Sequence, residues 1–160
     1  MSEMYFDDSI ILLNLEADNK EKVLTKMGQN LQTLGLVKDS FTDAIIAREA
    51  EFATGLPTKG VSVAIPHTDV EHVNRKTISV AVLKDPVDFC VMGDDEETTP
   101  VKIVFMLAMD KPHDQLSLLQ KLMQIFQDEA TLASIVEATS EAAVMKVLAD
   151  KLEFDFKGGE

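Results

Sequence analysis

The sequence predicts an α/β fold, a single layered domain with a central mixed β-sheet flanked by helices on both faces. Three observations favour this fold. Short apolar runs typical of strands alternate with longer segments in which apolar residues recur at helical spacing. The runs 78–83 and 101–109 are apolar at nearly every position, which is typical of strands covered on both faces. The length of 160 residues suits one domain better than two.

The chain is expected to start with a strand and a long helix. The strand is the continuous apolar run 9–15. Either Asp18 or Asn19 caps the helix that follows, and Gly35 ends it. The apolar residues on one face of this helix are Leu24, Met27, Leu31 and Leu34.

A second helix is expected from Ser40 to about Ala50, because Ser40-x-x-Asp43 resembles a capping box with the shorter acid. Arg48 then lies in the last turn, where the helix dipole favours a cation. A glycine- and proline-containing loop follows, and the β-branched run 61–65 is predicted to be a buried strand. The loop residues are Gly55, Pro57 and Gly60.

In the second half, the acidic segment 94–97 is expected to be a solvated turn between two strands. A helix opens at His113, and two more are predicted over 128–138 and 140–152. The methionine and leucine positions of these helices are assigned to the core. In the helix that His113 opens, the apolar positions are Leu116, Leu119, Leu122, Met123 and Phe126.

Composition narrows the possible functions. Acids outnumber bases 28 to 15, and the formal charge of −13 disfavours nucleic-acid binding and favours a basic protein partner. No run approaches the roughly 20 apolar residues that span a bilayer, and the N-terminus carries acids where a signal peptide needs bases. The single cysteine, Cys90, cannot form an internal disulfide and is assigned to packing. A cytoplasmic protein is expected.

His67 is the most promising reactive residue among the three histidines. It follows the predicted strand 61–65 directly after Pro66, which fixes the local φ angle and offers no ladder donor. The carboxyl edge of an open α/β sheet is where functional sites are usually built. Neutral imidazole accepts and releases a phosphoryl group near its ordinary pKa of ~6.5.

These residues carry a specific resemblance. The segment IAREAEFATGLPTKGVSVAIPHTD resembles the active-site region of enzyme IIA domains of the bacterial phosphoenolpyruvate-dependent sugar phosphotransferase system, in the mannitol/fructose class. The elements that carry it are Arg48 with Glu49, the Thr-Gly-Leu of 54–56, and the Val-Ala-Ile-Pro-His that ends at His67. The segment looks closest to the galactitol-specific branch. The similarity implies an enzyme IIA domain over 3–153, with a frayed tail over 154–160.

The resemblance implies roles for individual residues. Nε2 of His67 would accept the phosphoryl group, while Arg48 and His113 would neutralise and hydrogen-bond its oxygens. The hydroxyls of Thr54 and Thr68 would assist as phosphate-binding groups. The implied partners are HPr as donor and a IIB component as acceptor, with the membrane component IIC reached only indirectly. No bound cofactor or metal is implied, because phosphoenolpyruvate and Mg²⁺ act upstream.

Two alternatives remain at this point. The first is metal-assisted hydrolysis, since His67-x-Asp69-x-x-His72 offers three plausible ligands. The second keeps the fold but changes the role to a regulatory phosphoprotein of the nitrogen-related enzyme IIA type, which binds targets according to phosphorylation state. His72 and Arg75 otherwise look like surface residues of a polar, helical segment.

Overall fold

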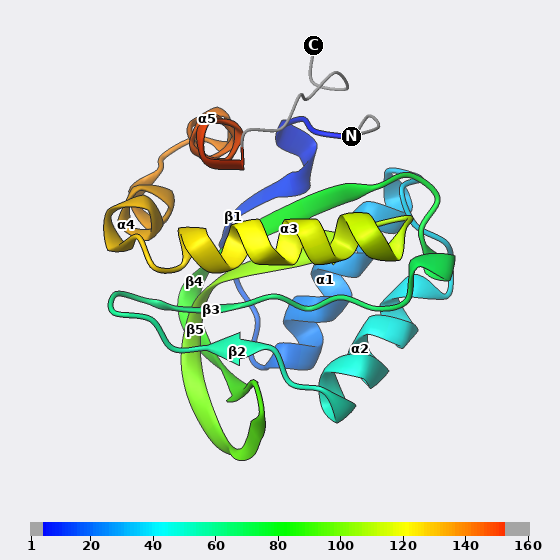
Figure 1. The fold of residues 1–160 in the computed structure, drawn as a ribbon, viewed down its shortest axis with the longest axis horizontal. Helices are drawn as coiled ribbons and strands as arrows, with labels where there is room; N and C mark the ends of the chain where they lie inside the picture. The colour runs from blue at the N-terminus through cyan, green and yellow to red at the C-terminus, as the bar shows by residue number, and fades with distance from the viewer. Residues whose placement is uncertain (1–4, 153–160) are drawn as a thin grey trace.

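The computed structural model describes residues 5–152 and confirms the predicted α/β fold with a mixed five-stranded sheet (Figure 1). The strands are β1 Ile11–Leu15, β2 Gly55–Leu56, β3 Ser62–Ala64, β4 Thr77–Val91 and β5 Asp94–Ala108. The helices are α1 Lys20–Thr33, α2 Phe41–Glu51, α3 Pro112–Ile125, α4 Glu129–Glu137 and α5 Glu141–Leu152, with short 3-10 turns at Asp8–Ile10 and Val70–His72. The predicted tail 154–160 lies outside the described residues.

The sheet places the ends of β3 and β5 side by side. β4 pairs in parallel with β1 and antiparallel with β5, while β3 pairs in parallel with β5 and antiparallel with β2. Ala64 lies opposite Val104 in the parallel register. Because parallel strands end at the same edge, residues that follow β3 and β5 meet there.

The two-residue strand β2 was predicted to be part of a loop. It also pairs with the far end of β4, at Gly55 opposite Val91. A Cβ atom at Gly55 would lie 2.5 Å from the carbonyl oxygen of Cys90, so only glycine allows this close approach. The glycine therefore holds the segment before β3 against the β4–β5 hairpin.

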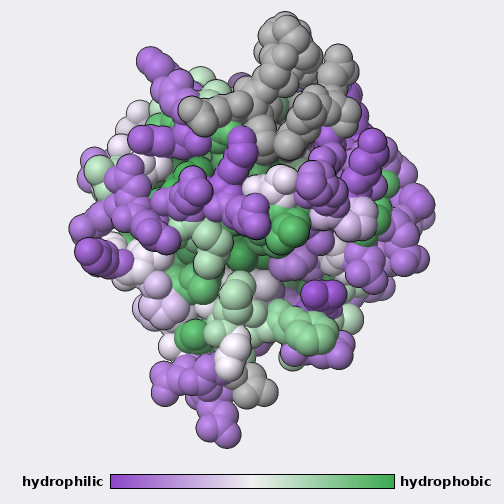
Figure 2. All heavy atoms as spheres, in the orientation of Figure 1, coloured by the Kyte–Doolittle hydropathy of each residue, from purple (hydrophilic) through white to green (hydrophobic). Residues whose placement is uncertain are grey.

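Helices cover both faces of the sheet: α3 crosses in front of the strands in Figure 1, and α1 lies behind them with α2 packed beside it. Leu31 of α1 and Leu122 of α3 are fully buried, and the rings of Phe105 and Phe126 lie 5.2 Å apart. Figure 2 shows hydrophobic residues gathered across the middle of the face that α3 crosses, with hydrophilic residues around them. Leu116 and Met123 are 55% and 40% exposed, so their assignment to the core was wrong.

The two predicted helix starts have different outcomes. The Asn19 side chain accepts a hydrogen bond from the Lys22 amide, which confirms it as the cap of α1. Ser40 precedes α2 but caps nothing with its side chain, so the predicted capping box was wrong. Its hydroxyl instead lies 2.7 Å from Nδ1 of His72, a long-range partner that no local pattern indicates.

The expected acidic turn over 94–97 was also wrong, because these residues begin β5. The chain reverses at Met92 and Gly93, where Gly93 supplies the positive φ of 79°. Figure 1 shows this hairpin extending beyond the rest of the sheet. A strand segment outside the core has no apolar face, so a charge run there is compatible with a strand.

None of the helices in the described part of the chain has both the length and the apolar character that a bilayer crossing requires.

A buried ion pair joins the start of α3 to the start of β4. Nζ of Lys76 lies 3.0 Å from a carboxylate oxygen of Asp114, and their side chains are 1% and 15% exposed. The hydrogen bond from Lys76 lowers the pKa of Asp114 below its ordinary value. Asp114 follows His113 in the first turn of α3, so this pair fixes where the helix begins.

Replacing Lys76 with methionine is expected to destabilise the fold by about 1 to 3 kcal/mol, because the half-buried Asp114 carboxylate loses its hydrogen-bond donor. The free energy of unfolding in urea measures the loss. Lys22→Met is the matched control: Lys22 pairs with Asp18 at 3.1 Å, but the two side chains are 58% and 85% exposed. The control is expected to cost less than about 1 kcal/mol, and equal losses in both variants would contradict this role for Lys76.

Candidate functional site

The segment that carries His67 is held by backbone hydrogen bonds on both sides. The Ile65 amide lies 3.3 Å from the Thr54 carbonyl oxygen, and the Leu107 amide donates to the Pro66 carbonyl at 3.0 Å. Pro66 itself is buried. His67 therefore follows β3 as predicted, at the edge of the sheet where β3 and β5 end, with its backbone held between β2 and β5.

The ring of His67 has a defined tautomer. Nδ1 lies 2.8 Å from the carbonyl oxygen of Ile65, two residues earlier. A carbonyl oxygen can only accept, so Nδ1 carries the proton and donates it. Nε2 of the neutral ring is then left with a free lone pair, which makes it the nucleophilic atom of this side chain.

The surroundings of His67 keep the ring neutral. Its side chain is half-buried, and desolvation lowers its pKa below the ordinary 6.5. The hydrogen bond to Ile65 acts in the opposite direction, and the positive charge of Arg48 lowers the pKa further. The reactive neutral form therefore predominates at neutral pH.

Because the pKa of His67 is lowered, the stability of the fold is expected to depend on pH. The unfolded chain binds this proton more tightly than the folded protein, so the stability from His67 is complete above pH 6.5 and is lost as the pH falls through the lower folded pKa. NMR titration of the imidazole is expected to show a midpoint below 6.5. Acidification should also destabilise wild type more than His67→Gln, and a midpoint at or above the ordinary value would contradict the burial described here.

Arg48 lies in the last turn of α2, as predicted, and its guanidinium is held by an aromatic ring. Cζ of Arg48 is 4.6 Å from the ring centroid of Phe52, which is 52% exposed. Nε of Arg48 is buried and, within residues 5–152, has no hydrogen-bond partner. The nearest carboxylate contact is long, at 4.0 Å to Asp69. Within the described residues, the Nε donor of Arg48 is therefore unused, and the charge of the guanidinium acts on His67.

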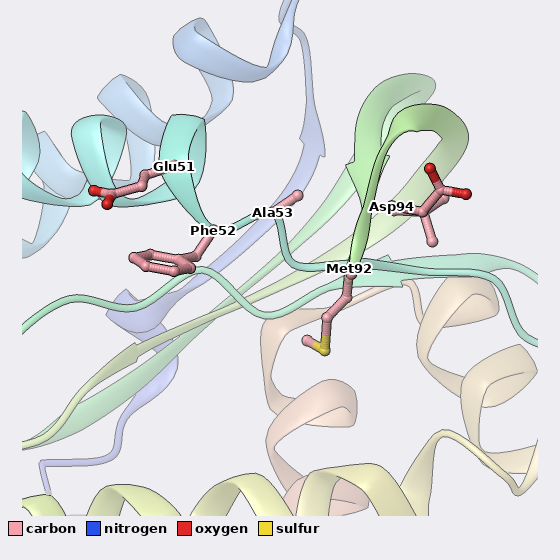
Figure 3. A pocket seen from close by; sticks show the side chains of 7 residues that line it. Glu51, Phe52, Ala53, Met92 and Asp94 are labelled. Carbon is pink, nitrogen blue, oxygen red and sulfur yellow. The ribbon is translucent and has the colours of Figure 1, made fainter.

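Phe52 is a site residue that sequence reasoning missed. Figure 3 shows it just beyond α2, near Met92 from the β4–β5 hairpin. Both residues line one pocket, and His67 is not among the residues that line it. The only signal in the sequence was an aromatic residue four positions after an arginine, since residues at that spacing meet on a helix.

Glu49 is a second missed residue, although it belongs to the motif at Arg48. It is 3% exposed, and it accepts hydrogen bonds from the Thr54 amide at 2.8 Å and the Thr54 hydroxyl at 2.7 Å. Burial raises its pKa above the ordinary value. The signal was its spacing: Phe41, Ile45 and Glu49 recur every fourth residue and share the buried face of α2.

The two threonines assigned to phosphate binding are both buried. Thr54 is 4% exposed, and its hydroxyl contacts Glu49 and the Ile65 amide. Thr68 is 7% exposed and directly follows His67. Binding of phosphate by these hydroxyls stays a prediction, and for Thr54 it would require the hydroxyl to give up an existing partner.

His113 is the second residue of α3, which begins one residue earlier than predicted. Its side chain is exposed. The connection from β5 to α3 starts at the edge of the sheet where His67 lies, and amide donors at the start of a helix favour anions. His113 is therefore a donor at the N-terminus of a helix that leaves the edge carrying His67.

His67, Asp69 and His72, the three ligands of the alternative metal site, do not form a ligand cluster in the structure. His72 is half-buried in a single 3-10 turn, where Nδ1 lies 2.7 Å from the Ser40 hydroxyl. Asp69 is exposed and has its long contact with Arg48. Within the described residues, no group of three or more histidine, cysteine or acidic side chains is arranged to hold a metal ion. Arg75 is exposed and lies over the ring of Tyr5.

Together these groups suit phosphoryl transfer. A neutral ring nitrogen with a free lone pair is a nucleophile, and a guanidinium with unused donors stabilises charge on equatorial oxygens. His67 is half-buried, so part of its side chain remains exposed to solvent.

Comparison with known proteins identifies the family. Residues 4–151 match the family model described as phosphoenolpyruvate-dependent sugar phosphotransferase system, EIIA 2. The galactitol-specific EIIA component of Escherichia coli K12 is 31% identical over 118 residues, which are 74% of this chain and 78% of the relative. The mannitol-specific enzyme IIA component of Staphylococcus aureus MRSA252 is 30% identical over 148 residues, covering 92% and 96% of the two chains.

A solved structure supports the fold. The complex of the mannitol enzyme IIA with phosphorylated enzyme IIB from E. coli aligns with a TM-score of 0.74 at 22% identity, covering 92% of this chain and 99% of that one. Proteins of the matched family are components of a phosphotransferase system. The chain therefore belongs to the EIIA 2 family of the phosphoenolpyruvate-dependent sugar phosphotransferase system.

Proposed function

We propose that this protein is a phosphoryl carrier that accepts its phosphoryl group from phospho-HPr on Nε2 of His67 and passes it to a IIB component. The observation that carries the proposal is the 2.8 Å hydrogen bond from Nδ1 to the Ile65 carbonyl, which leaves Nε2 free. Arg48 and His113 serve as the groups that bind the phosphoryl oxygens. The formal charge of −13 favours encounter with a basic donor protein.

The transfer step requires no proton movement. The lone pair of Nε2 forms the new N–P bond while the electron pair of the donor's N–P bond returns to the donor nitrogen. The ring of His67 gains positive charge as the bond forms. The Ile65 carbonyl oxygen stabilises that charge through the Nδ1 proton. Reversal of the same step delivers the group to the next acceptor.

The matched relatives include galactitol- and mannitol-specific proteins, and the segment around His67 favours galactitol as the transported sugar. For the mannitol enzyme IIA of E. coli, a complex with phosphorylated IIB has been solved. By analogy, the face around His67 would bind a IIB component. The likeness to galactitol proteins makes a galactitol IIB the first acceptor to test.

The test is a reconstituted relay with phosphoenolpyruvate, enzyme I, HPr and separate galactitol, fructose and mannitol IIB proteins. The expected result is one phosphate on the protein, followed by its loss to one IIB and not to the others. Absence of acceptance from phospho-HPr would overturn the proposal. Acceptance without transfer to any IIB would favour the regulatory, nitrogen-related role.

A further inference from the structure

We infer that Glu49 and Thr54 are positioning residues, which fix the tautomer and orientation of the His67 ring so that Nε2 can attack phosphorus. The inference rests on the proposed role of His67 as the phosphoryl acceptor. It assigns a function to a carboxylate that would not itself touch the phosphoryl group.

A series of hydrogen bonds leads from Glu49 to the ring. The Thr54 hydroxyl donates to Glu49 at 2.7 Å, and the Ile65 amide lies 3.2 Å from the Thr54 hydroxyl oxygen. The Ile65 carbonyl then accepts from Nδ1 of His67 at 2.8 Å. Each bond lies between groups that are buried or half-buried, so water competes poorly for them.

Glu49 determines the direction of these bonds. The Thr54 amide and hydroxyl each donate to a different oxygen of Glu49, so the single proton of the hydroxyl points toward the carboxylate. The hydroxyl oxygen then turns a lone pair toward the Ile65 amide. The second carboxylate oxygen accepts from the Thr54 amide at 2.8 Å, which fixes the backbone of the same residue. The Ile65 amide is shared between this hydroxyl oxygen at 3.2 Å and the Thr54 carbonyl oxygen at 3.3 Å, so Thr54 holds the backbone of Ile65 through two acceptors. The Ile65 carbonyl in turn selects the ring tautomer.

The same carboxylate also positions the cation. Glu49 directly follows Arg48 in the last turn of α2, and its two bonds to Thr54 tie that turn to the segment entering β2. A change at Glu49 therefore moves the guanidinium relative to His67. The buried Glu49 side chain therefore positions both the His67 ring and the Arg48 guanidinium.

The experiment uses the full chain with ¹⁵N-labelled histidine. In the unphosphorylated protein, NMR reports the ring tautomer of His67, and acceptance from phospho-HPr is timed separately. Thr54→Val removes the hydroxyl while keeping the shape, and Thr54→Ser keeps the hydroxyl. Thr42→Val is the matched control, because the Thr42 hydroxyl is also buried and has no hydrogen-bond partner within the described residues.

Thr54→Val leaves only the Thr54 carbonyl oxygen to hold the Ile65 amide and frees the Glu49 carboxylate from the hydroxyl. It is expected to let the ring populate both tautomers and to slow acceptance by roughly a hundredfold, since small misplacements of a reacting group cost about that much. Thr54→Ser and Thr42→Val are expected to keep the wild-type tautomer and rate. Glu49→Gln provides a second test if Thr54→Val does not fold, because its amide cannot accept from both Thr54 donors. It should shift the tautomer in the same way.

A folded Thr54→Val or Glu49→Gln protein with the wild-type tautomer and the wild-type rate would overturn the inference. Failure of wild type to accept phosphate would instead refute the proposed function. The tautomer measurement needs no phosphoryl donor, so it still tests the positioning of the ring in that event.

Discussion

His67→Gln is expected to abolish phosphoryl acceptance completely, because glutamine has no nitrogen lone pair in place of Nε2 and no other described histidine has the same setting. Intact-mass measurement after incubation with phosphoenolpyruvate, enzyme I and HPr is expected to show one added phosphate on wild type and none on the variant. The wild-type adduct should be labile in acid and stable in alkali, as expected for a phosphoramidate.

His72→Gln is the matched control for this substitution. His72 is also half-buried, but its Nδ1 faces the Ser40 hydroxyl and not a backbone carbonyl. The control is expected to accept phosphate like wild type. A full phosphate on His67→Gln, or an adduct mapped to a serine, would remove His67 as the acceptor.

Arg48→Ala and His113→Ala are each expected to slow phosphoryl transfer about a hundredfold, or about 3 kcal/mol, because each removes a donor to the phosphoryl oxygens. Both variants should stay folded and still accept phosphate slowly, which separates their role from that of His67. The larger defect is expected in transfer to IIB. Rapid-quench measurements give the transfer rates. Repeating them at several salt concentrations tests whether a variant is slow only because the electrostatic attraction between the partner proteins is weaker.

Arg75→Ala is the matched control for Arg48, since Arg75 also lies over an aromatic ring, 5.1 Å from the centroid of Tyr5. It is expected to transfer at the wild-type rate. The double variant of Arg48 and His113 should lose less than the sum of the single losses, because both groups meet the same oxygens. Wild-type transfer rates in both single variants would contradict these roles. Arg48 would then be only a cation that stabilises the end of α2, and His113 only a residue at the start of α3.

Local patterns predicted much of the fold. The alternation of apolar runs and amphipathic segments predicted the α/β class, the caps at Asn19 and Gly35 bounded α1, and the run before Pro66 predicted β3. These features depend on neighbours in the chain. Arg48 and His67 were assigned to one site for the same reason, because both belong to one continuous motif, and their roles stay predictions.

Two of the features that were missed depend on partners far along the chain. The Ser40 hydroxyl meets His72 and caps nothing, and the buried Lys76 finds Asp114 on another element. Glu49 was named as part of the motif with Arg48 but was given no role, and it proves to be buried, accepting two hydrogen bonds from Thr54. The segment 94–97 looked like a loop because its residues are all acidic, and Asp94, Glu96 and Glu97 are exposed in a hairpin that extends beyond the rest of the sheet.

The central claim is that the Ile65 carbonyl holds Nδ1 of His67 as a donor, so that Nε2 forms the bond to phosphorus. The most direct measurement is NMR of the phosphorylated, ¹⁵N-histidine-labelled protein, in which phosphorus coupling identifies the bonded ring nitrogen. The account predicts a single phosphohistidine at His67, with phosphorus on Nε2 and the proton retained on Nδ1. Phosphorus on Nδ1, or on any residue other than His67, would contradict it.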